Sequence, residues 1–306
     1  MIKILIDTDL GSDVDDSIAL YLALRNKDVR VVGITTVFKN APQRARIARS
    51  ICTSFGKNVP VFAGSRNATD KQLDKNADTL FSSLVQDVKG EDNPQDENGD
   101  RAIDFILDCA KKYGKELHIL AIGPLTNIAR AVCKDRKALE GIGSVTLMGG
   151  NYFQGKPEWN FYCDATAAQI VLSSGLKVYA VGSDVTVRTV LPYKLQEQTV
   201  DLASLDTAKG LIGKHAKLWM DKSRFAITLH DPLALYAIVY PELLHFKEQL
   251  VAVEAQSKTS YGYVMNYSLT AWYPKTQGHS VMIADYVDEE KVIGLFVKEF
   301  LEAEDC

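Results

Sequence analysis

Five aspartates lie within ten residues near the start of the chain: Asp7, Asp9, Asp13, Asp15 and Asp16. Carboxylates packed this closely repel one another, and a divalent cation with oxygen ligands would relieve the repulsion. The plainer interpretation is a solvated acidic turn in which an aspartate caps the helix that follows. The spacing therefore predicts either a cation site or a capped, hydrated turn.

The acidic turn joins two elements of different periodicity. The apolar run at 1–6 predicts a buried strand, and residues 17–24 have apolar side chains at helical spacing. The aspartates thus follow the carboxyl end of the first strand. In open α/β sheets this is where ligands bind, which favours the cation site.

Short apolar runs alternate with helical patterns along the next part of the chain. Strands are predicted at 29–37, 117–122, 142–148 and 177–181, and helices at 43–55, 102–113, 127–133 and 165–174. This alternation predicts an α/β fold with an open, mostly parallel, Rossmann-like sheet and helices on both faces.

The last third of the chain has a different pattern. Helices are predicted at 205–220, 231–239 and 290–303, and strand-like runs occur at 250–255, 261–267 and 280–287. These strands predict a small antiparallel addition near the C-terminus. We expect a single domain over residues 1–306, with a long surface loop at 65–100 because that stretch is polar and has no periodicity.

Composition excludes several classes of partner. The 306 residues are 46% hydrophobic and 24% charged, as in ordinary globular proteins, and the net charge is −4. Without a basic stripe, nucleic acid is not an expected partner. No apolar run reaches the length of a membrane span, so no membrane is expected either. The five scattered cysteines, without a CxxC pair, predict free thiols in a reducing cytoplasm.

Polar side chains recur after later predicted strands. They are Asn40, the segment 123–127, the segment 149–151, Glu158 with Asn160, and His230–Asp231. In a parallel sheet these turns would all lie at one edge, facing the acidic turn. Each also has an ordinary explanation, such as a helix cap, a polar loop or a core histidine. Taken together, the ordinary explanations become less convincing, because all five polar segments would have to fall at the same edge of the sheet by chance.

The ordered set of motifs resembles the signatures of the nucleoside hydrolases, the inosine–uridine-preferring ribohydrolase family. The matching segments are DTDLG at 7–11 with DD at 15–16, GITTV at 33–37 with Asn40, GPLTN at 123–127, MGG at 148–150, EWN at 158–160, DVT at 184–186 and HD at 230–231. The resemblance implies calcium-dependent hydrolysis of the N-glycosidic bond of ribonucleosides, giving ribose and a free purine or pyrimidine base. It further implies a homodimer or homotetramer, working in nucleoside salvage.

The same resemblance implies a role for each matching residue. Calcium would be held by Asp9, Asp16, the main-chain oxygen of Thr126 and Asp231. The substrate would be bound by Asp15, Asn40, Asn151, Glu158, Asn160 and Asp231. Asp9 would take a proton from the attacking water, and His230 would protonate the leaving base.

The sequence departs from the family's pattern at the acidic turn. Leu10 replaces the usual proline, and two extra residues, which we assign to Asp13 and Val14, lengthen the turn. Asp13 could therefore take the role given to Asp15. The family's His-Gly loop has no counterpart at 87–100, and the segment 224–225 before His230 is expected to cover the base.

Two other functions stay open. A haloacid-dehalogenase-like, magnesium-dependent phosphatase would use Asp7 as nucleophile and Asp9 as acid/base, but it leaves the later motifs without a role. A non-catalytic nucleoside-binding protein would use calcium only as a clamp. Against it, a base, an acid and metal ligands all occur in the one sequence.

Overall fold

The computed structural model describes residues 1–70, 98–223, 225–269 and 278–304. Their strands form one sheet in the order β3-β2-β1-β4-β5-β6-β9-β7-β8. The parallel strands are β1 (Ile2–Thr8), β2 (Val29–Thr36), β3 (Val61–Ala63), β4 (Leu117–Ala121), β5 (Ser144–Met148), β6 (Val178–Val181) and β9 (His279–Val287). β7 (Leu244–Val253) pairs antiparallel with both β9 and β8 (Val264–Asn266). The predicted α/β fold, with its antiparallel part near the C-terminus, is confirmed.

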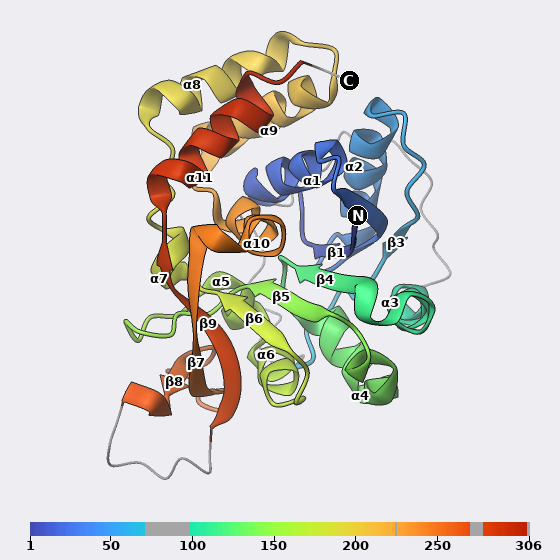
Figure 1. Cartoon of the computed structure of the whole chain (residues 1–306), viewed down its shortest axis with the longest axis vertical. Helices are drawn as coiled ribbons and strands as arrows, with labels where there is room; N and C mark the ends of the chain where they lie inside the picture. The colour runs from blue at the N-terminus through green and yellow to red at the C-terminus, as the bar shows by residue number, and fades with distance from the viewer. Residues whose placement is uncertain (71–97, 224, 270–277, 305–306) are drawn as a thin grey trace.

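Helices cover both faces of this sheet (Figure 1). One face packs against α1 (Asp15–Arg25), α2 (Ala41–Ser54) and α10 (His230–Val239), and the other against α3 (Asp100–Tyr113), α4 (Thr126–Glu140) and α6 (Ala165–Leu172). β1 shows why two cores form. Its Ile4 and Ile6 enter the first core and its Leu5 the second, because side chains alternate across a strand.

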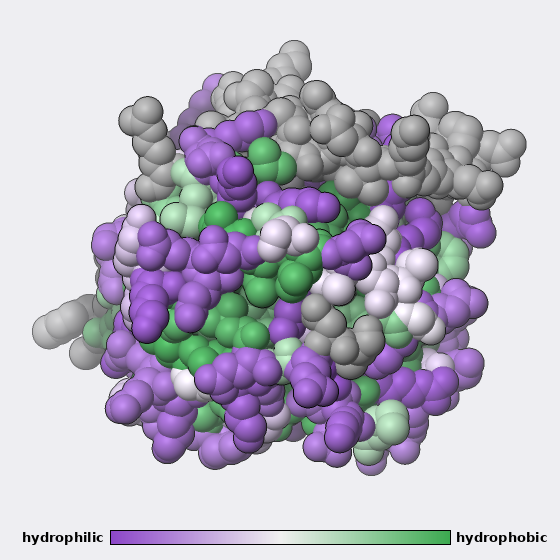
Figure 2. Space-filling view, turned by 90° about the horizontal axis from the view of Figure 1, so that it is seen from above, coloured by the Kyte–Doolittle hydropathy of each residue, from purple (hydrophilic) through white to green (hydrophobic). Residues whose placement is uncertain are grey.

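A further layer of helices lies over α1. It consists of α8 (Tyr193–Asp201), α9 (Ala208–Ser223) and α11 (Glu289–Phe296), which continues as a π-helical turn over Val297–Leu301 (Figure 1). The face of the molecule on this side is hydrophilic over much of its area, with apolar residues gathered nearer its middle (Figure 2). No helix among the described residues is long and apolar enough to cross a membrane.

Several elements differ from their predicted extents. β7 begins at Leu244 rather than at 250, because its first half is largely exposed and carries charged residues that hide the strand pattern. β3 and α8 were not predicted, since β3 has only three residues and α8 buries few side chains. α4 continues past 133 to Glu140 across a non-helical Asp135. The predicted loop at 65–100 lies mostly outside the described residues.

The path of the chain identifies a switch point in the sheet. From β1 the chain moves outward through β2 and β3, and then β4 returns to the opposite side of β1. In open α/β sheets, ligands bind at such a point, outside the carboxyl ends of the strands. The acidic turn leaves β1 here, and the turn at 122–125 leaves β4 beside it.

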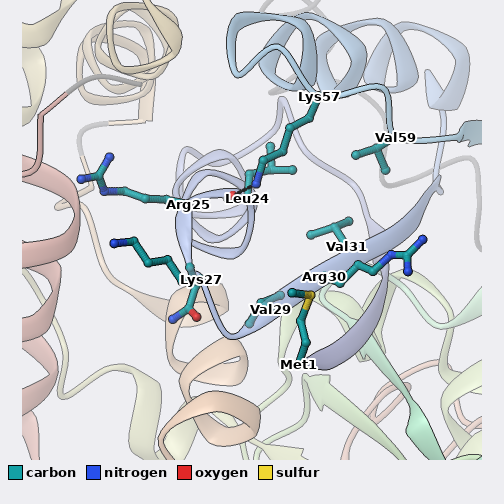
Figure 3. A pocket seen from close by; sticks show the side chains of 10 residues that line it. Met1, Leu24, Arg25, Lys27, Val29, Arg30, Val31, Lys57 and Val59 are labelled. Carbon is teal, nitrogen blue, oxygen red and sulfur yellow. Dashed lines mark hydrogen bonds between the residues drawn. The ribbon is translucent and has the colours of Figure 1, made fainter.

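A basic hollow lies at the opposite, amino-terminal end of the sheet. It has a volume of about 350 Å³, lies at the C-terminal end of α1 and is lined by Arg25, Lys27, Arg30 and Lys57 among apolar residues (Figure 3). Arg25 and Arg30 point away from each other there (Figure 3). α1 therefore runs from an acidic end to a basic end.

Candidate active site

Three carboxylates meet at the carboxyl edge of the sheet. Asp15 and Asp16 begin α1, and Asp231 lies in the first turn of α10. Ligand atoms of the three side chains lie within 4.8 Å of one another, and all three residues are buried. An all-oxygen donor set of this kind suits a hard divalent cation such as calcium or magnesium.

The electrostatics of this cluster also fit a cation. Burial, followed by repulsion from neighbouring carboxylates, raises the pKa of Asp15, Asp16 and Asp231 well above its ordinary value. The alternative of a solvated, aspartate-capped turn is wrong, because Val14 is the N-cap of α1 and no side chain caps it. Buried like charges without a counter-ion are unfavourable, whereas a bound cation would stabilise their ionised forms.

Hydrogen bonds hold these acids in place. The main-chain N–H of Asp231 donates to Asp15 Oδ2 at 3.2 Å, which joins α10 to α1. Thr8 Oγ1 donates to Asp16 Oδ1 from the end of β1. The acidic ends of two helices are thereby fixed against one strand, and both helices direct their N-terminal dipoles at the acids.

Asp7 lies beneath the turn rather than in the cluster. Its Oδ1 accepts hydrogen bonds from Thr35 Oγ1 at 2.5 Å and from Asn127 Nδ2 at 2.7 Å. Burial raises the pKa of Asp7 to about 7. A carboxylate held by these two hydrogen bonds stabilises the edge of the sheet. It is poorly placed for the nucleophilic role that the phosphatase alternative requires.

Asp9 lies near the group of Asp15, Asp16 and Asp231 without belonging to it. Its charge raises the pKa of all three clustered acids and of Glu158. A Cβ atom on Gly123 would lie 2.9 Å from Asp9 Oδ1, so the turn after β4 approaches this carboxylate closely. The sequence assigned Asp9 to the metal and Asp15 to the ribose, whereas the structure groups Asp15 with the two other assigned ligands.

The lengthened part of the turn carries Asp13. Burial, with smaller contributions from the charges of Asp16 and Asp9, raises the pKa of Asp13 to about 7, so its carboxyl belongs to the same electrostatic environment. Among the described residues, the structure groups Asp15 and not Asp13 with Asp16 and Asp231. Asp15 rather than Asp13 therefore belongs to the close group, and the ribose-binding role assigned to Asp15 stays a prediction.

Glu158 and Asn160 lie at the same edge of the sheet. Glu158 is the N-cap of α5 (Trp159–Cys163) and accepts from the N–H groups of Asn160, Phe161 and Gly150 at 2.9, 3.1 and 2.8 Å. Asn160 Nδ2 donates to the carbonyl of Ile122, which directly follows β4, and to that of Met148, the last residue of β5. Both side chains are therefore rigidly placed beside the carboxyl ends of the central strands.

Asn151 differs from these two residues. Its Nδ2 donates to Ser183 Oγ at 3.0 Å, and its Oδ1 accepts from the N–H of Gln154 at 3.0 Å. Both ends of the amide thus shape the loop after β5. Its predicted contact with substrate would require one of these bonds to be shared or exchanged.

Asn40 is presented by an unusual backbone. Phe38 and Lys39 both have left-handed φ angles, of 72° and 49°, which cost roughly 1 kcal/mol each for residues with a Cβ. Main-chain bonds from their N–H groups to Ser65 and Arg66 hold this shape, at 2.8 and 2.7 Å. Asn40 then precedes α2 without capping it, which leaves its side chain available to a ligand.

His230 is oriented from behind by a hydroxyl. Thr186 Oγ1 lies 2.6 Å from His230 Nδ1, and α7 (Ser183–Thr186) places it there. Burial lowers the pKa of His230 to about 4, so the ring is neutral near pH 7. When the threonine donates to Nδ1, the ring proton is on Nε2, where it can be donated to a ligand.

Two buried residues of the site were missed from the sequence. Asp164 Oδ2 accepts from Thr126 Oγ1 at 2.7 Å and from Thr69, and its Oδ1 caps α6. It thereby fixes the start of α4, where Thr126 was assigned its metal contact. Arg44 bonds to the acidic turn itself. The available signal was its position between Ala41 and Ala48 on the apolar face of α2.

Aromatic side chains are exposed near this edge. Trp159 and Tyr162 of α5 are 42% and 39% exposed, and their ring centroids lie 6.3 Å apart. Phe225, which the sequence placed in a loop over the base, is 70% exposed. Arg224 of the same predicted loop lies outside the described residues.

Sequence comparisons relate most of the chain to enzymes that hydrolyse nucleosides. A family model described as inosine-uridine preferring nucleoside hydrolase matches residues 4–294. The chain is 32% identical to a protein from Oryza sativa subsp. japonica named probable uridine nucleosidase 2, over 98% of this chain and 93% of that one. It is 27% identical to the pyrimidine-specific ribonucleoside hydrolase RihB of Escherichia coli O1:K1 / APEC, over 85% of each.

Solved structures give the same result. The purine-preferring ribonucleoside hydrolase from Gardnerella vaginalis superposes with a TM-score of 0.78 at 28% identity, covering 97% of each chain. A plant nucleoside hydrolase superposes with a TM-score of 0.82 over 99% of each chain, and at 24% identity this likeness concerns the fold alone.

Proposed function

This chain belongs to the family of the inosine-uridine preferring nucleoside hydrolases, enzymes that act on N-glycosyl bonds, and on that premise we propose that it hydrolyses ribonucleosides to ribose and a free base with calcium as cofactor. The observation that carries the proposal is the buried group of Asp15, Asp16 and Asp231 at the switch point of the sheet. Its oxygen donors fit a hard cation, and membership of the family indicates the type of reaction.

Calcium would be held by the carboxylates of Asp9, Asp16 and Asp231 and by the main-chain oxygen of Thr126. The position of Asp15 within the buried group supports a close approach of its carboxylate to the same ion. When bound, calcium would lower the pKa of a water molecule and accept ribose hydroxyls in its flexible coordination shell.

The side chains around the ion divide the remaining work. Asp9 would take the proton of the attacking water, since burial raises its pKa and makes it a better base. Asp15, Asn40, Glu158, Asn160 and Asp231 would orient the ribose. The surrounding carboxylates would stabilise the positive charge that develops on the ribosyl ring as the bond breaks.

His230 would assist departure of the base. Its Nε2–H, set by Thr186 on the other ring nitrogen, would donate to the base nitrogen that leaves. A neutral ring can begin as a hydrogen-bond donor and transfer its proton as negative charge builds on the leaving base.

Uridine is the first substrate to examine. Relatives 30–32% identical over 95–98% of this chain are named uridine nucleosidases. Other relatives are named pyrimidine-specific or purine-preferring, so inosine, cytidine and adenosine belong in the same assay. We also propose a homodimer or homotetramer that acts in the cytoplasm, and light scattering of the purified protein measures its assembly.

A reducing-sugar assay tests the proposed function directly. Ribose release from uridine or inosine is expected with calcium and is expected to stop after the metal is stripped with EDTA. Asp16→Asn should require far more calcium for ribose release. Its control is Glu140→Gln, which alters an exposed carboxylate on α4 and should behave as the wild type. Absence of release from every ribonucleoside would contradict the proposal. Turnover of p-nitrophenyl phosphate with magnesium would favour the phosphatase, and tight inosine binding without hydrolysis would favour the binding protein.

A further inference from the structure

Arg44 is a buried arginine to which the proposed function gives no role. It lies in the first turn of α2 and is 4% exposed. Its Nε donates to the carbonyl of Phe38 at 3.0 Å. One of its terminal nitrogens donates to the carbonyls of Asp9 and Leu10, the latter at 3.1 Å, and to Ser12 Oγ at 2.7 Å. One guanidinium group thus bonds to two loops that are about 30 residues apart in the sequence.

These two loops carry different parts of the candidate site. The acidic turn provides Asp9. It also includes Asp13 and Val14, which we assigned as the two residues that lengthen the turn relative to the family's pattern. The loop at 37–40 provides Asn40, after the left-handed pair Phe38 and Lys39. The N–H of Arg44 also donates to the carbonyl of Asn40 at 3.0 Å, so Asn40 is tied to the same residue through the start of α2.

The partners of Arg44 show what it fixes. They are main-chain carbonyls and a hydroxyl, so the guanidinium fixes backbone positions rather than one carboxylate rotamer. The planar guanidinium offers five N–H donors in a fixed fork, whereas a lysine has one compact ammonium group. A lysine at this position could hold one of the loops but not both. The positive charge of Arg44 also interacts favourably with Asp9 and Asp16, which compensates in part for its burial.

We propose that Arg44 is a positioning residue that locks the lengthened acidic turn to the Asn40 loop. The inference rests on the proposed function, because it treats the turn as the cation side of the site and Asn40 as part of the ribose side. With both loops on one guanidinium, a displacement of either loop moves the other. Cation binding and ribose binding are therefore coupled through Arg44, in addition to any direct contact between the two ligands.

Arg44→Lys tests this coupling because it keeps the charge and loses the fork. Arg49→Lys is the matched control, since Arg49 is on the same helix and donates to the carbonyl of Val61 at 2.9 Å instead. Calorimetric titration of metal-stripped protein should show calcium affinity weakened roughly tenfold in Arg44→Lys. At saturating calcium, its KM for the best ribonucleoside should rise roughly tenfold, with a smaller change in kcat. Arg49→Lys should stay within about twofold of the wild type in both measurements.

A double-mutant cycle with Asn40→Ala separates positioning from general loosening of the fold. If Arg44 acts through Asn40, the rise in KM caused by Asn40→Ala should be several times smaller in the Arg44→Lys background. Multiplicative effects of the two substitutions would overturn the inference. If Arg44→Lys does not fold, Ser12→Ala takes its place in the cycle, because Ser12→Ala removes one hydrogen-bond partner of Arg44. Non-multiplicative effects then support the inference, and multiplicative effects overturn it.

The wild-type measurements distinguish failure of the inference from failure of the proposed function. A wild-type protein that binds no calcium and releases no ribose contradicts the function, and the inference with it. A wild-type protein that does both, beside an Arg44→Lys variant that matches Arg49→Lys, overturns the inference alone.

Discussion

The two ends of α1 carry opposite charges in opposite surroundings. At its N-terminus, Asp15 and Asp16 are each 3% exposed and are packed against Asp231. At its C-terminus, Arg25 and Lys57 line an open hollow and donate to the main-chain carbonyls of Glu304 and Leu24. Both arrangements suit the helix dipole, which stabilises such charges by about 0.3–1 kcal/mol at exposed sites.

Burial, rather than charge, therefore distinguishes the two ends of α1. At the hollow, Arg25 and Lys57 donate to main-chain carbonyls, and the charged ends of Arg25 and Arg30 point apart (Figure 3). The acids have lost most of their water and repel one another, and the dipole is too weak to compensate for that. Only the acidic end therefore requires a partner, and a cation meets the requirement.

The largest effect is expected from Asp9→Ala. Removal of the base should lower kcat on ribonucleosides about 10²- to 10⁴-fold. Lys27→Ala at the basic end is the control, and its kcat should equal that of the wild type. Initial rates of ribose release measure both, with circular dichroism to confirm folding. An Asp9→Ala enzyme of near-normal kcat would show that the base lies elsewhere.

His230→Ala should have the next largest effect, and its size should depend on the leaving group. On uridine we expect kcat to fall about 10²-fold, because the departing base is no longer protonated. On p-nitrophenyl riboside, whose leaving group needs no proton, the fall should be less than about threefold. Equal losses on both substrates would argue against the acid role.

The stability of the metal-free protein should depend on pH in a defined direction. Asp7 and Asp13 each have a folded pKa of about 7, raised by burial above the unfolded value of about 3.9. Such groups contribute stability that is present at low pH and lost as the pH rises through 7. Without calcium, Tm should therefore fall by several degrees between about pH 5 and about pH 8.

Calcium should reverse this trend, because it stabilises the ionised carboxylates. In Asp16→Asn, which removes one repelling charge, the metal-free protein should be at least as stable as the wild type near pH 8, and calcium should raise its Tm less. Thermal scans with and without EDTA measure both effects. A metal-free Tm that rises from pH 5 to pH 8 would contradict the electrostatic account.

The smallest effects are expected at the basic end. Arg30→Met and Lys27→Ala should each change the free energy of unfolding by less than about 0.5 kcal/mol, as is usual for exposed residues. Neither should alter ribose release. If either variant lost turnover, or if an added anion stabilised the wild type and not the variants, the hollow would be a ligand site and the contrast between the two ends would fail.

The sequence was most informative where chemistry and strand order coincide. The acidic turn after β1, the turn after β4 and the start of α10 follow elements with strong periodicity, so their common edge could be predicted. Arg44 and Asp164 could not be predicted as parts of the site. Arg44 bonds to the acidic turn 32–35 residues before it, and Asp164 bonds to Thr126 and Thr69, which lie 38 and 95 residues before it, so only tertiary packing brings these groups together. The relative placement of Asp9 and Asp15 depends on the same packing, because the lengthened turn sets it.

Calcium titration of the metal-stripped enzyme, followed by ribose release from the best ribonucleoside, measures whether the buried acids hold a catalytic cation. We expect no measurable turnover without metal and full recovery as one calcium binds per chain. The Asp16→Asn variant should require far more calcium, and Glu140→Gln should follow the wild type. Full turnover by the metal-free wild type would contradict the claim that the buried acids at the start of α1 exist to hold a cation.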